Sequence, residues 1–588
     1  MRILFFAPHS AIWVHAFPEA LVAEALQQHG HDIAYVSCGG TFERYCVPMS
    51  AHGLNAHATP AARLAVCNLC RRYDGLLREE FGLRGPKLTE ILTRESEIEV
   101  DSIIASTTRA SMLALERDSV PVGRIALYQL MLRRKRIDLD FTDVEWQEYQ
   151  VELRNTLYAW MAGKALLNQY KPDRVLVYNA LYSVNRAICK LAEARGIPAY
   201  FLHAGGNLAN RLQTLMLGRG DTFAYMPHIV SQWPRFVHVP CTPRLLSLVT
   251  EHYVELLRGR SVFVYSSTRR KERFDARAHF RVGNDQKLLI ATMGSYDEEV
   301  AAELVGARQH GKRPAFQTQI DWVRAVLEFV SSRKDLFVIV RVHPREFPNR
   351  RDGVLSQHAQ LLQSALSSLP RNAAVNWPAD GISVYDLADQ ADVILNSWSS
   401  VGKEMSLLGI PVVIYSDELA FYPSDLNYIG TNREAYFSAI DEALRDGWDV
   451  ERSRKAYRWA AFEFSHATVF IGDSYPEVEH PVRPLATKIM ERLRRHMNAD
   501  FKQRRDCRRR LPEMQAAAQI TALIESGANS PVDHLDVNDI EQTGLAEETA
   551  ALKKELRRLA NALFPDPASR VSSRLYARLT DFTRRGSS

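Results

Sequence analysis

Two stretches of sequence decide the fold: FVIVRVHPRE at residues 337–346 and DVILNSWSSVGKEMSLLGIPVVIY at residues 392–415. The first begins with an apolar, β-branched run from Phe337 to Val342, which is typical of a strand buried on both faces of a parallel sheet. In the second, a short apolar run from Val393 to Leu395 leads through a polar turn into a helix, and another strand follows from Pro411 to Tyr415. The second stretch therefore predicts a βαβ unit.

Polar side chains follow both predicted strands. Arg341 and His343 come at the end of the first strand. The turn after the second strand provides hydroxyl groups and a glycine: Ser397, Ser399, Ser400 and Gly402. Ligands of open α/β sheets bind beyond the carboxyl ends of the strands, so we expect both groups to face one site. Hydroxyls and free amide N–H groups at the start of a helix favour a phosphate. The alternative is that these residues only cap a strand and a helix.

The order Arg-x-His-Pro, Ser-Ser-x-Gly-x-Glu and Gly-Ile-Pro-Val resembles the nucleotide-binding domain of GT-B glycosyltransferases. It is most similar to bacterial capsule-polysaccharide and Kdo-transferase-type enzymes. CDP-glycerol polyol-phosphate transferases and some bacterial sialyltransferases share the His-Pro and Ser-Ser pair. The resemblance implies that His343, Ser399 and Ser400 contact the donor phosphate and that Glu404 contacts the ribose.

The resemblance also implies an α/β fold of GT-B type, in which two Rossmann-like domains face a cleft. A chain of 588 residues suits two such domains and an appendage. We expect an acceptor domain at 1–255 with a helical insertion at about 71–167, a donor domain at 256–482, and a basic helical extension at 483–588. In GT-B enzymes the first turn of the donor domain also contacts the donor, which here implicates Gly294 and Ser295; a glycine permits close backbone approach.

Three imidazoles are candidates for the general base. His9 and His15 follow the predicted strand from Arg2 to Ala7, and His203 lies near the end of the later strand AYFLHAGG. An imidazole titrates near neutral pH, where base catalysis is most effective. A histidine at a helix start is more often a capping or packing residue. The resemblance implies a Glu-x-Gly-like turn where this chain has His203-Ala204-Gly205, so the identity of the base stays open.

Four of the seven cysteines lie close together in the sequence: Cys38, Cys46, Cys67 and Cys70. In a cytoplasmic protein, a Cys-x-x-Cys pair more often binds metal or is redox-active than forms a structural disulfide. Two pairs could supply four thiolates to a structural zinc. The wide spacing of Cys38 and Cys46 favours the alternative of unrelated buried thiols. Catalysis is expected to need no cofactor.

Composition and charge bear on location and partners. The chain is 46% hydrophobic and 24% charged, like ordinary globular proteins, and has no run of eighteen apolar residues. Its start does not resemble a signal peptide, so we expect a cytoplasmic location. Residues 481–588 hold 20 Lys and Arg against 14 Asp and Glu. This surplus predicts a solvated helix face or, alternatively, attraction to the inner membrane. Nucleic acid is not expected, because the densest basic block, Arg492 to Arg510, has one Phe and no stacking pattern.

These observations predict a metal-independent glycosyltransferase that moves a sugar from a nucleotide-activated donor to a growing bacterial surface polysaccharide, of capsule or lipopolysaccharide type. Its acceptor would be a saccharide or a lipid-linked saccharide, and its C-terminal helices could dock on polysaccharide-assembly proteins or the membrane. The alternatives are a UDP-sugar 2-epimerase-like enzyme, a CDP-polyol phosphotransferase and a non-catalytic assembly protein. The sequence specifies neither the nucleotide, the sugar nor the stereochemistry.

Overall fold

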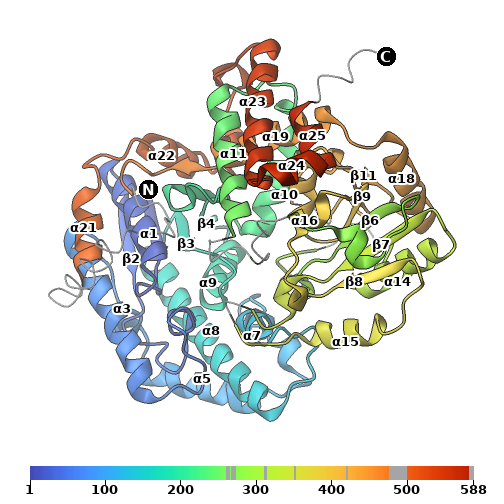
Figure 1. Cartoon of the computed structure of the whole chain (residues 1–588). Helices are drawn as coiled ribbons and strands as arrows, with labels where there is room; N and C mark the ends of the chain where they lie inside the picture. The colour runs from blue at the N-terminus through green and yellow to red at the C-terminus, as the bar shows by residue number, and fades with distance from the viewer. Residues whose placement is uncertain are drawn as a thin grey trace.

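The computed structural model describes residues 1–259, 265, 273–309, 314–349, 352–418, 421–475 and 500–581. Within these residues the chain forms two six-stranded sheets, each in its own α/β domain (Figure 1). Their strand orders are β12-β5-β4-β3-β1-β2 and β11-β10-β9-β6-β7-β8. Two doubly wound, mainly parallel sheets in one chain constitute the GT-B fold that the sequence predicted.

The N-terminal sheet is parallel over four of its strands: β1 (Arg2–Phe6), β2 (Asp32–Val36), β3 (Arg174–Tyr178) and β4 (Ala199–Ala204). β5 (Thr214–Arg219) runs antiparallel to β4, and β12 (Val469–Phe470) runs antiparallel to β5. Helices α1 (Trp13–Gln28) and α9 (Ser183–Ala194) follow β1 and β3. The ends of β1, β3 and β4 are therefore adjacent at one edge of this sheet.

All neighbouring strands of the C-terminal sheet are parallel: β6 (Lys287–Thr292), β7 (Leu336–Arg341), β8 (Ala373–Asn376), β9 (Val393–Asn396), β10 (Val412–Ile414) and β11 (Tyr428–Ile429). Along β6, Leu288 and Ile290 face one apolar core, whereas Leu289 and Ala291 face another. This explains the unbroken apolar runs, since a strand covered on both faces cannot alternate with polar residues. β6 lies between β7 and β9, so the turns after these three strands meet.

Helices of the C-terminal domain cover both faces of its sheet. They are α12 (Ala276–Phe280), α13 (Tyr296–Leu304), α14 (Gln319–Ser331), α15 (Gln357–Ala365), α16 (Val384–Ala388), α17 (Val401–Leu407), α18 (Arg433–Asp446) and α19 (Val450–Ala461). A π-helical turn, Phe462–His466, continues α19 toward the N-terminal domain.

A helical insertion separates β2 from β3. It contains α2 (Val47–Ala51), α3 (Pro60–Phe81), α4 (Leu88–Ile91), α5 (Arg94–Ser106), α6 (Val122–Ile125), α7 (Leu127–Arg134) and α8 (Asp143–Tyr170). Thr142 begins α8 by accepting the N–H of Glu145, a capping box that fixes the start of this long helix. Helix α7 packs against α13. The insertion therefore links the two domains.

The end of the chain returns to the N-terminal domain. β12 joins its sheet before residue 482, the predicted end of the donor domain. Helix α21 (Phe501–Arg509) contacts α3, and α22 (Ala517–Ser526) packs on α1 (Figure 1). Helix α23 (Leu545–Leu563) packs between α11 (Pro243–Arg258) and α25 (Arg574–Thr580). Helix α10 (Thr222–Gln232) contacts β5, and the short helix α24 (Pro567–Ser572) contacts α25.

Part of the basic C-terminal extension packs against the N-terminal domain of the same chain. Arg510 pairs with Glu24 of α1 at 3.0 Å, and its guanidinium carbon lies 4.2 Å from the centre of the Phe81 ring. Residues 492–499 of the predicted basic block lie outside the described part of the chain. Across the described residues, no helix combines the length and the apolar character that crossing a membrane requires.

Candidate functional site

The turns after β6, β7 and β9 enclose a cavity of about 120 Å³, which we call the His343 cavity. Its lining comes from both predicted motifs, from the end of β6 and from the domain boundary: Leu256, Tyr265, Thr292, Met293, Arg341, His343, Pro344, Ser399, Ser400, Val401 and Glu404. The structure thus brings together five residues that the sequence nominated from positions up to 63 apart. The sheet order explains this, because only β6 separates β7 from β9.

The hydrogen bonds of His343 define its tautomer. Its Nδ1 accepts the backbone N–H of Arg345 at 3.2 Å and lies 3.3 Å from the hydroxyl oxygen of Ser295. A backbone N–H can only donate, so Nδ1 carries no proton and Nε2 does. Burial lowers the pKa of His343 to about 4. At neutral pH the imidazole is therefore uncharged, with one N–H that can donate to a ligand.

Arg341 lies at the floor of the His343 cavity, at the end of β7. Its guanidinium donates to the carbonyl oxygen of Ile382 at 2.9 Å and to the side chain of Asn376. Burial lowers its pKa to about 10, which still leaves it charged at neutral pH. Its two hydrogen-bond partners are neutral, whereas the carboxylates of Asp386 and Asp380 offset part of its charge from a distance. The remaining positive charge adds to the potential of the cavity.

Ser400 and Glu404 are bonded to each other within the turn and helix after β9. The hydroxyl of Ser400 donates to Glu404 at 2.9 Å, and that of Tyr385 donates to the same carboxylate at 2.6 Å. Burial raises the pKa of Glu404. Ser399 accepts the N–H of Val401 through its hydroxyl at 3.3 Å. The first amide of α17 is thus partly satisfied, contrary to the free amide groups expected from the sequence.

Three nominated residues support the site from behind. The hydroxyls of Ser397 and Tyr415 lie 2.9 Å apart, and Ser397 is buried away from the His343 cavity. At Gly402, an added Cβ would lie 1.8 Å from the hydroxyl oxygen of Tyr422. At Gly294, a Cβ would lie 2.0 Å from the carbonyl oxygen of Trp398, so only glycine lets the turns after β6 and β9 approach. These residues shape the turns, and they do not line the cavity.

A second cavity of about 270 Å³, the Trp398 cavity, shares Ser399 and Ser400 with the first. Its other lining residues are mostly aromatic or charged: Met226, Glu298, Trp398, Lys403, Phe421, Tyr422 and Glu463. Met226 belongs to α10 of the N-terminal domain, so this cavity lies between the domains. Sequence reasoning missed Lys403, although it stands inside the nominated helix, and missed Glu463, which no motif marks.

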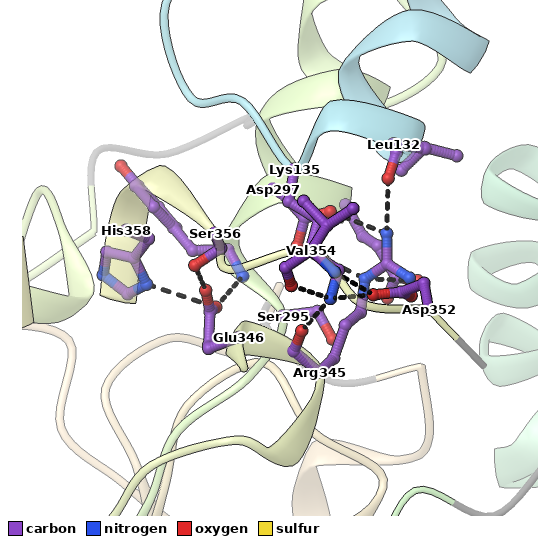
Figure 2. A network of polar contacts seen from close by, with 12 residues as sticks. Leu132, Lys135, Ser295, Asp297, Arg345, Glu346, Asp352, Val354, Ser356 and His358 are labelled. Atoms are coloured by element: carbon purple, nitrogen blue, oxygen red, sulfur yellow. Dashed lines mark hydrogen bonds and ion pairs between the residues drawn. The ribbon is translucent and has the colours of Figure 1, made fainter. Parts of the chain in front are cut away.

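The loop that carries His343 is held by the helical insertion (Figure 2). The Lys135 ammonium, directly after α7, donates to the carbonyl oxygens of Arg345 at 2.6 Å and Val354 at 2.8 Å, and it pairs with Asp352 at 2.6 Å. Its side chain is only 1% exposed. Lys135 has φ 48°, the left-handed conformation that ends α7 and turns the side chain into this loop.

Arg345 forms the second half of this network. Its guanidinium donates to Asp297 at 2.7 Å, to the carbonyl oxygen of Leu132 at 3.1 Å and to the hydroxyl of Tyr265 at 3.3 Å. Burial raises the pKa of Asp297 to about 6, against the opposing effect of Arg345. Ser295 occupies the N-cap position of α13, and Asp297, in the first turn of this helix, holds Arg345.

The three candidate bases lie together in the N-terminal domain. The His15 ring stacks on Tyr178 with centres 4.1 Å apart, His203 lies 5.9 Å from the same tyrosine, and His9 contacts Tyr182 edge-on at 5.3 Å. Burial lowers the pKa of His9 to about 3 and that of His203 to about 4, and it also lowers the pKa of His15. The residues lining the two cavities include none of the three. Their catalytic role stays a prediction.

All four nominated cysteines line a third cavity of about 280 Å³ at the ends of β1 and β2. Burial raises the pKa of each thiol, including that of Cys70 to about 12. In the described part of the chain, no three His, Cys, Asp or Glu side chains are placed as a metal site. The structure thus gathers Cys38, Cys46, Cys67 and Cys70 around one space, and zinc binding there stays a prediction.

Two α/β domains with a polar cavity at the strand ends define the GT-B class, and we base this assignment on the sheet order of the chain itself. No family model and no curated protein sequence matches it. Its structure is similar to the KpsC beta Kdo 2,4 transferase of Thermosulfurimonas dismutans, at 15% identity over 48% of this chain and 78% of that one, with a TM-score of 0.30.

Two further solved structures share this similarity. One is the UDP-GlcNAc 2-epimerase of Methanocaldococcus jannaschii in complex with UDP-GlcNAc and UDP, at 14% identity over 78% of this chain and 98% of that one, with a TM-score of 0.27. The other is the spinosyn rhamnosyltransferase SpnG, at 12% identity over 82% and 98%, with a TM-score of 0.23.

Proposed function

We propose that this protein is a GT-B glycosyltransferase that binds a nucleotide-activated sugar through its phosphate in the His343 cavity. The observation that carries this proposal is that Arg341, His343, Ser399, Ser400 and Glu404 line one cavity at the ends of neighbouring parallel strands. The acceptor would be a saccharide or lipid-linked saccharide of a bacterial surface polysaccharide, as the resemblance in the sequence implies.

The geometry supports phosphate binding by fixed donors. The free Nε2–H of His343 would donate to a phosphate oxygen, and the hydroxyls of Ser399 and Ser400 could turn toward the same group. Arg341 adds a positive charge at the floor. During transfer, the bond from the anomeric carbon to the phosphate oxygen would break, with its electron pair left on the phosphate. A hydroxyl oxygen of the acceptor would bond to the anomeric carbon and lose its proton to a base. His343 and Arg341 are already held in place by their hydrogen bonds, so they would stabilise the developing charge without reorganisation.

The test is a thermal-shift screen with CMP, CDP, UDP, GDP and their sugars. A nucleotide present at 100 times its dissociation constant stabilises the protein by about 2.7 kcal/mol. His343→Ala combined with Ser400→Ala should abolish the shift and sugar transfer while the protein stays folded. His57→Ala, an exposed histidine of the insertion, is the matched control. Unchanged binding in the double variant would refute the proposal, and turnover of a UDP-sugar without acceptor would instead indicate an epimerase.

A further inference from the structure

The Trp398 cavity has a fixed aromatic wall. The rings of Trp398 and Phe421 meet with centres 5.9 Å apart at 64°. The guanidinium of Arg308 lies 4.9 Å from the Trp398 ring centre and is itself held by Glu299 at 3.0 Å and by the carbonyl oxygen of Glu418 at 3.1 Å. Rigid aromatic rings offer a large contact area at little entropic cost, and they suit a ligand with one apolar face.

The same cavity also has a charged part, which is an ion pair between Lys403 and Glu463. The ammonium of Lys403 lies 2.8 and 2.7 Å from the two carboxylate oxygens of Glu463. These side chains are only 16% and 12% exposed. Glu463 belongs to the π-helical turn after α19, a type of element that is frequent at functional sites. The pair presents both a donor and an acceptor to a bound molecule.

The N-terminal domain closes this cavity near the strand that carries His203. A Cβ placed on Gly206, just after β4, would lie 3.5 Å from Oε1 of Glu463 and 3.4 Å from the Phe464 ring. The chain lacks an acidic residue in the turn after β4, where the resemblance implies one. The structure brings the carboxylate of Glu463 to that turn from another part of the chain.

The charges of the lining are already compensated. Lys403 is committed to Glu463, and Glu298 lies 3.3 Å from the guanidinium of Arg345. An acidic ligand would need to take Lys403 from its partner and leave the largely buried carboxylate of Glu463 uncompensated. Breaking a buried ion pair in this way is strongly unfavourable. Hydroxyl groups, by contrast, can bond to both members of the pair without separating them.

We propose that the Trp398 cavity is a subsite for an uncharged pyranose ring, stacked on the aromatic wall, with its hydroxyls bonded to the Lys403–Glu463 pair. This inference rests on the proposed function, because the shared residues Ser399 and Ser400 place the ring beside the phosphate. It names a neutral sugar, in contrast to the acidic Kdo of the enzymes that the sequence resembles. The ring belongs either to the donor or to the acceptor.

The direct test is saturation-transfer NMR on the full chain with methyl β-D-glucopyranoside, methyl N-acetyl-β-D-glucosaminide and methyl β-D-galactopyranoside as neutral probes. N-acetylneuraminic acid is the acidic probe. Each is measured with and without the nucleotide that gives the largest thermal shift. We expect at least one neutral probe to bind at least tenfold more tightly than the acidic one. Binding of none of the neutral probes, or equal binding of the acidic probe, overturns the proposal.

Two variants sharpen the result. Trp398→Ala should weaken the neutral probe at least tenfold. Glu463→Gln frees the Lys403 ammonium, so it should strengthen the acidic probe about tenfold. Glu193→Gln, which breaks the exposed Lys190 pair at 2.7 Å, is the matched control and should change neither. If Glu463→Gln leaves the ratio of the affinities for neutral and acidic probes unchanged, the proposed subsite for a neutral sugar is contradicted.

Binding measurements with nucleotide-sugars show whether the ring comes from the donor or from the acceptor. Binding of the nucleotide alone tests the proposed function independently of the subsite. Tighter binding of a UDP-, CDP- or GDP-hexose than of its nucleotide alone, lost in Trp398→Ala, assigns the ring to the donor. Binding of the glycoside together with the intact nucleotide-sugar assigns it to the acceptor. Nucleotide binding should persist in both cavity variants. If the wild type binds neutral sugars but no nucleotide, the proposed function fails and the subsite stands.

Discussion

The ammonium nitrogen of Lys135 lies 2.6 Å from the carbonyl oxygen of Arg345, two residues beyond His343 (Figure 2). Lys135 belongs to the insertion of the N-terminal domain, whereas Arg345 follows a strand of the C-terminal sheet. One domain thus fixes the loop that presents the His343 imidazole of the other. In an enzyme with a site between domains, such a contact couples the relative position of the domains to the geometry of the site.

Replacing Lys135 with methionine should destabilise the protein by about 3 kcal/mol, because buried carbonyl oxygens and Asp352 lose their partner. Urea unfolding measures the change, and Lys190→Met is the exposed control. We also expect weaker nucleotide binding, since the loop carrying His343 loses its anchor. A change in unfolding free energy below about 0.5 kcal/mol, a value common at surface sites, would contradict the role assigned to Lys135.

Gly294→Ala should lower stability by about 1–3 kcal/mol and weaken nucleotide binding. Its new methyl group would meet the Trp398 carbonyl oxygen at 2.0 Å and push the turn after β9 outward. Gly75→Ala within α3 meets nothing within 4 Å and is the matched control, expected to stabilise slightly. Differential scanning calorimetry with and without nucleotide measures both effects. If the two variants had equal stability and equal nucleotide affinity, the turns after β6 and β9 would not need the close approach that Gly294 permits.

Ser397→Ala and Ser400→Ala should differ although both serines belong to the same motif. Ser397 bonds to buried Tyr415, so its loss should cost about 1 kcal/mol of stability and leave nucleotide affinity unchanged. Ser400 lines both cavities and donates to buried Glu404, so its loss should lower affinity in addition to costing about 1 kcal/mol of stability. Isothermal titration calorimetry and urea unfolding on each variant provide the comparison. If Ser397→Ala lowered nucleotide affinity and Ser400→Ala did not, Ser397 rather than Ser400 would contact the ligand.

His343 should remain uncharged, with its proton on Nε2, from pH 8 down to about pH 5. Burial lowers its pKa to about 4, and the N–H of Arg345 occupies Nδ1. Long-range ¹H–¹⁵N spectra of histidine-labelled protein report the tautomer, with His343→Gln identifying the resonance. A midpoint near 6.5, or a proton on Nδ1 at neutral pH, would disprove this geometry.

Acidification should destabilise the fold between pH 6.5 and pH 4. The pKa values of His9, His203 and His252 are lowered by burial to about 3, 4 and 3, below the unfolded value of about 6.5. In that interval the unfolded chain binds more protons, so stability is complete above pH 6.5 and falls as the pH falls. Each such histidine contributes about 1.4 kcal/mol per pH unit.

Urea unfolding at pH 7.5, 6 and 5 measures this loss. His252→Gln tests one contribution, because its Nδ1 accepts the N–H of Leu208 at 3.0 Å and an amide oxygen could replace it. The variant should be less stable at pH 7.5 and should show a shallower pH slope than the wild type. Identical slopes would show that His252 does not titrate differently on folding.

The sequence predicted the C-terminal sheet closely because its strands are buried on both faces. The runs at 337–342, 393–395 and 411–415 correspond to β7, β9 and β10, and their turns enclose one cavity. Strand burial and sheet-edge geometry are local consequences of composition. The same reasoning assigned too many serines of the motif to ligand binding. It could not distinguish Ser400, which lines the cavity, from Ser397, which faces the core.

The groups supplied from far away in the chain were not predictable in this way. Lys135 reaches the His343 loop because α7 ends in a left-handed turn, and Glu463 reaches the Trp398 cavity because α19 changes to a π-helical turn. Neither conformation has a motif in the sequence. Both depend on how the two domains are docked, which only tertiary structure reveals.

The pairing of β12 with β5 has a consequence for biosynthesis. The core of the first domain holds Ile3 and Phe5 together with Val469, Ile520 and Leu523. A nascent chain therefore exposes the edge of β5 until the ribosome has passed residue 470, and the domain made first is finished last. Chaperone occupancy of ribosome-bound intermediates should be high until then, because unpaired edge strands favour aggregation.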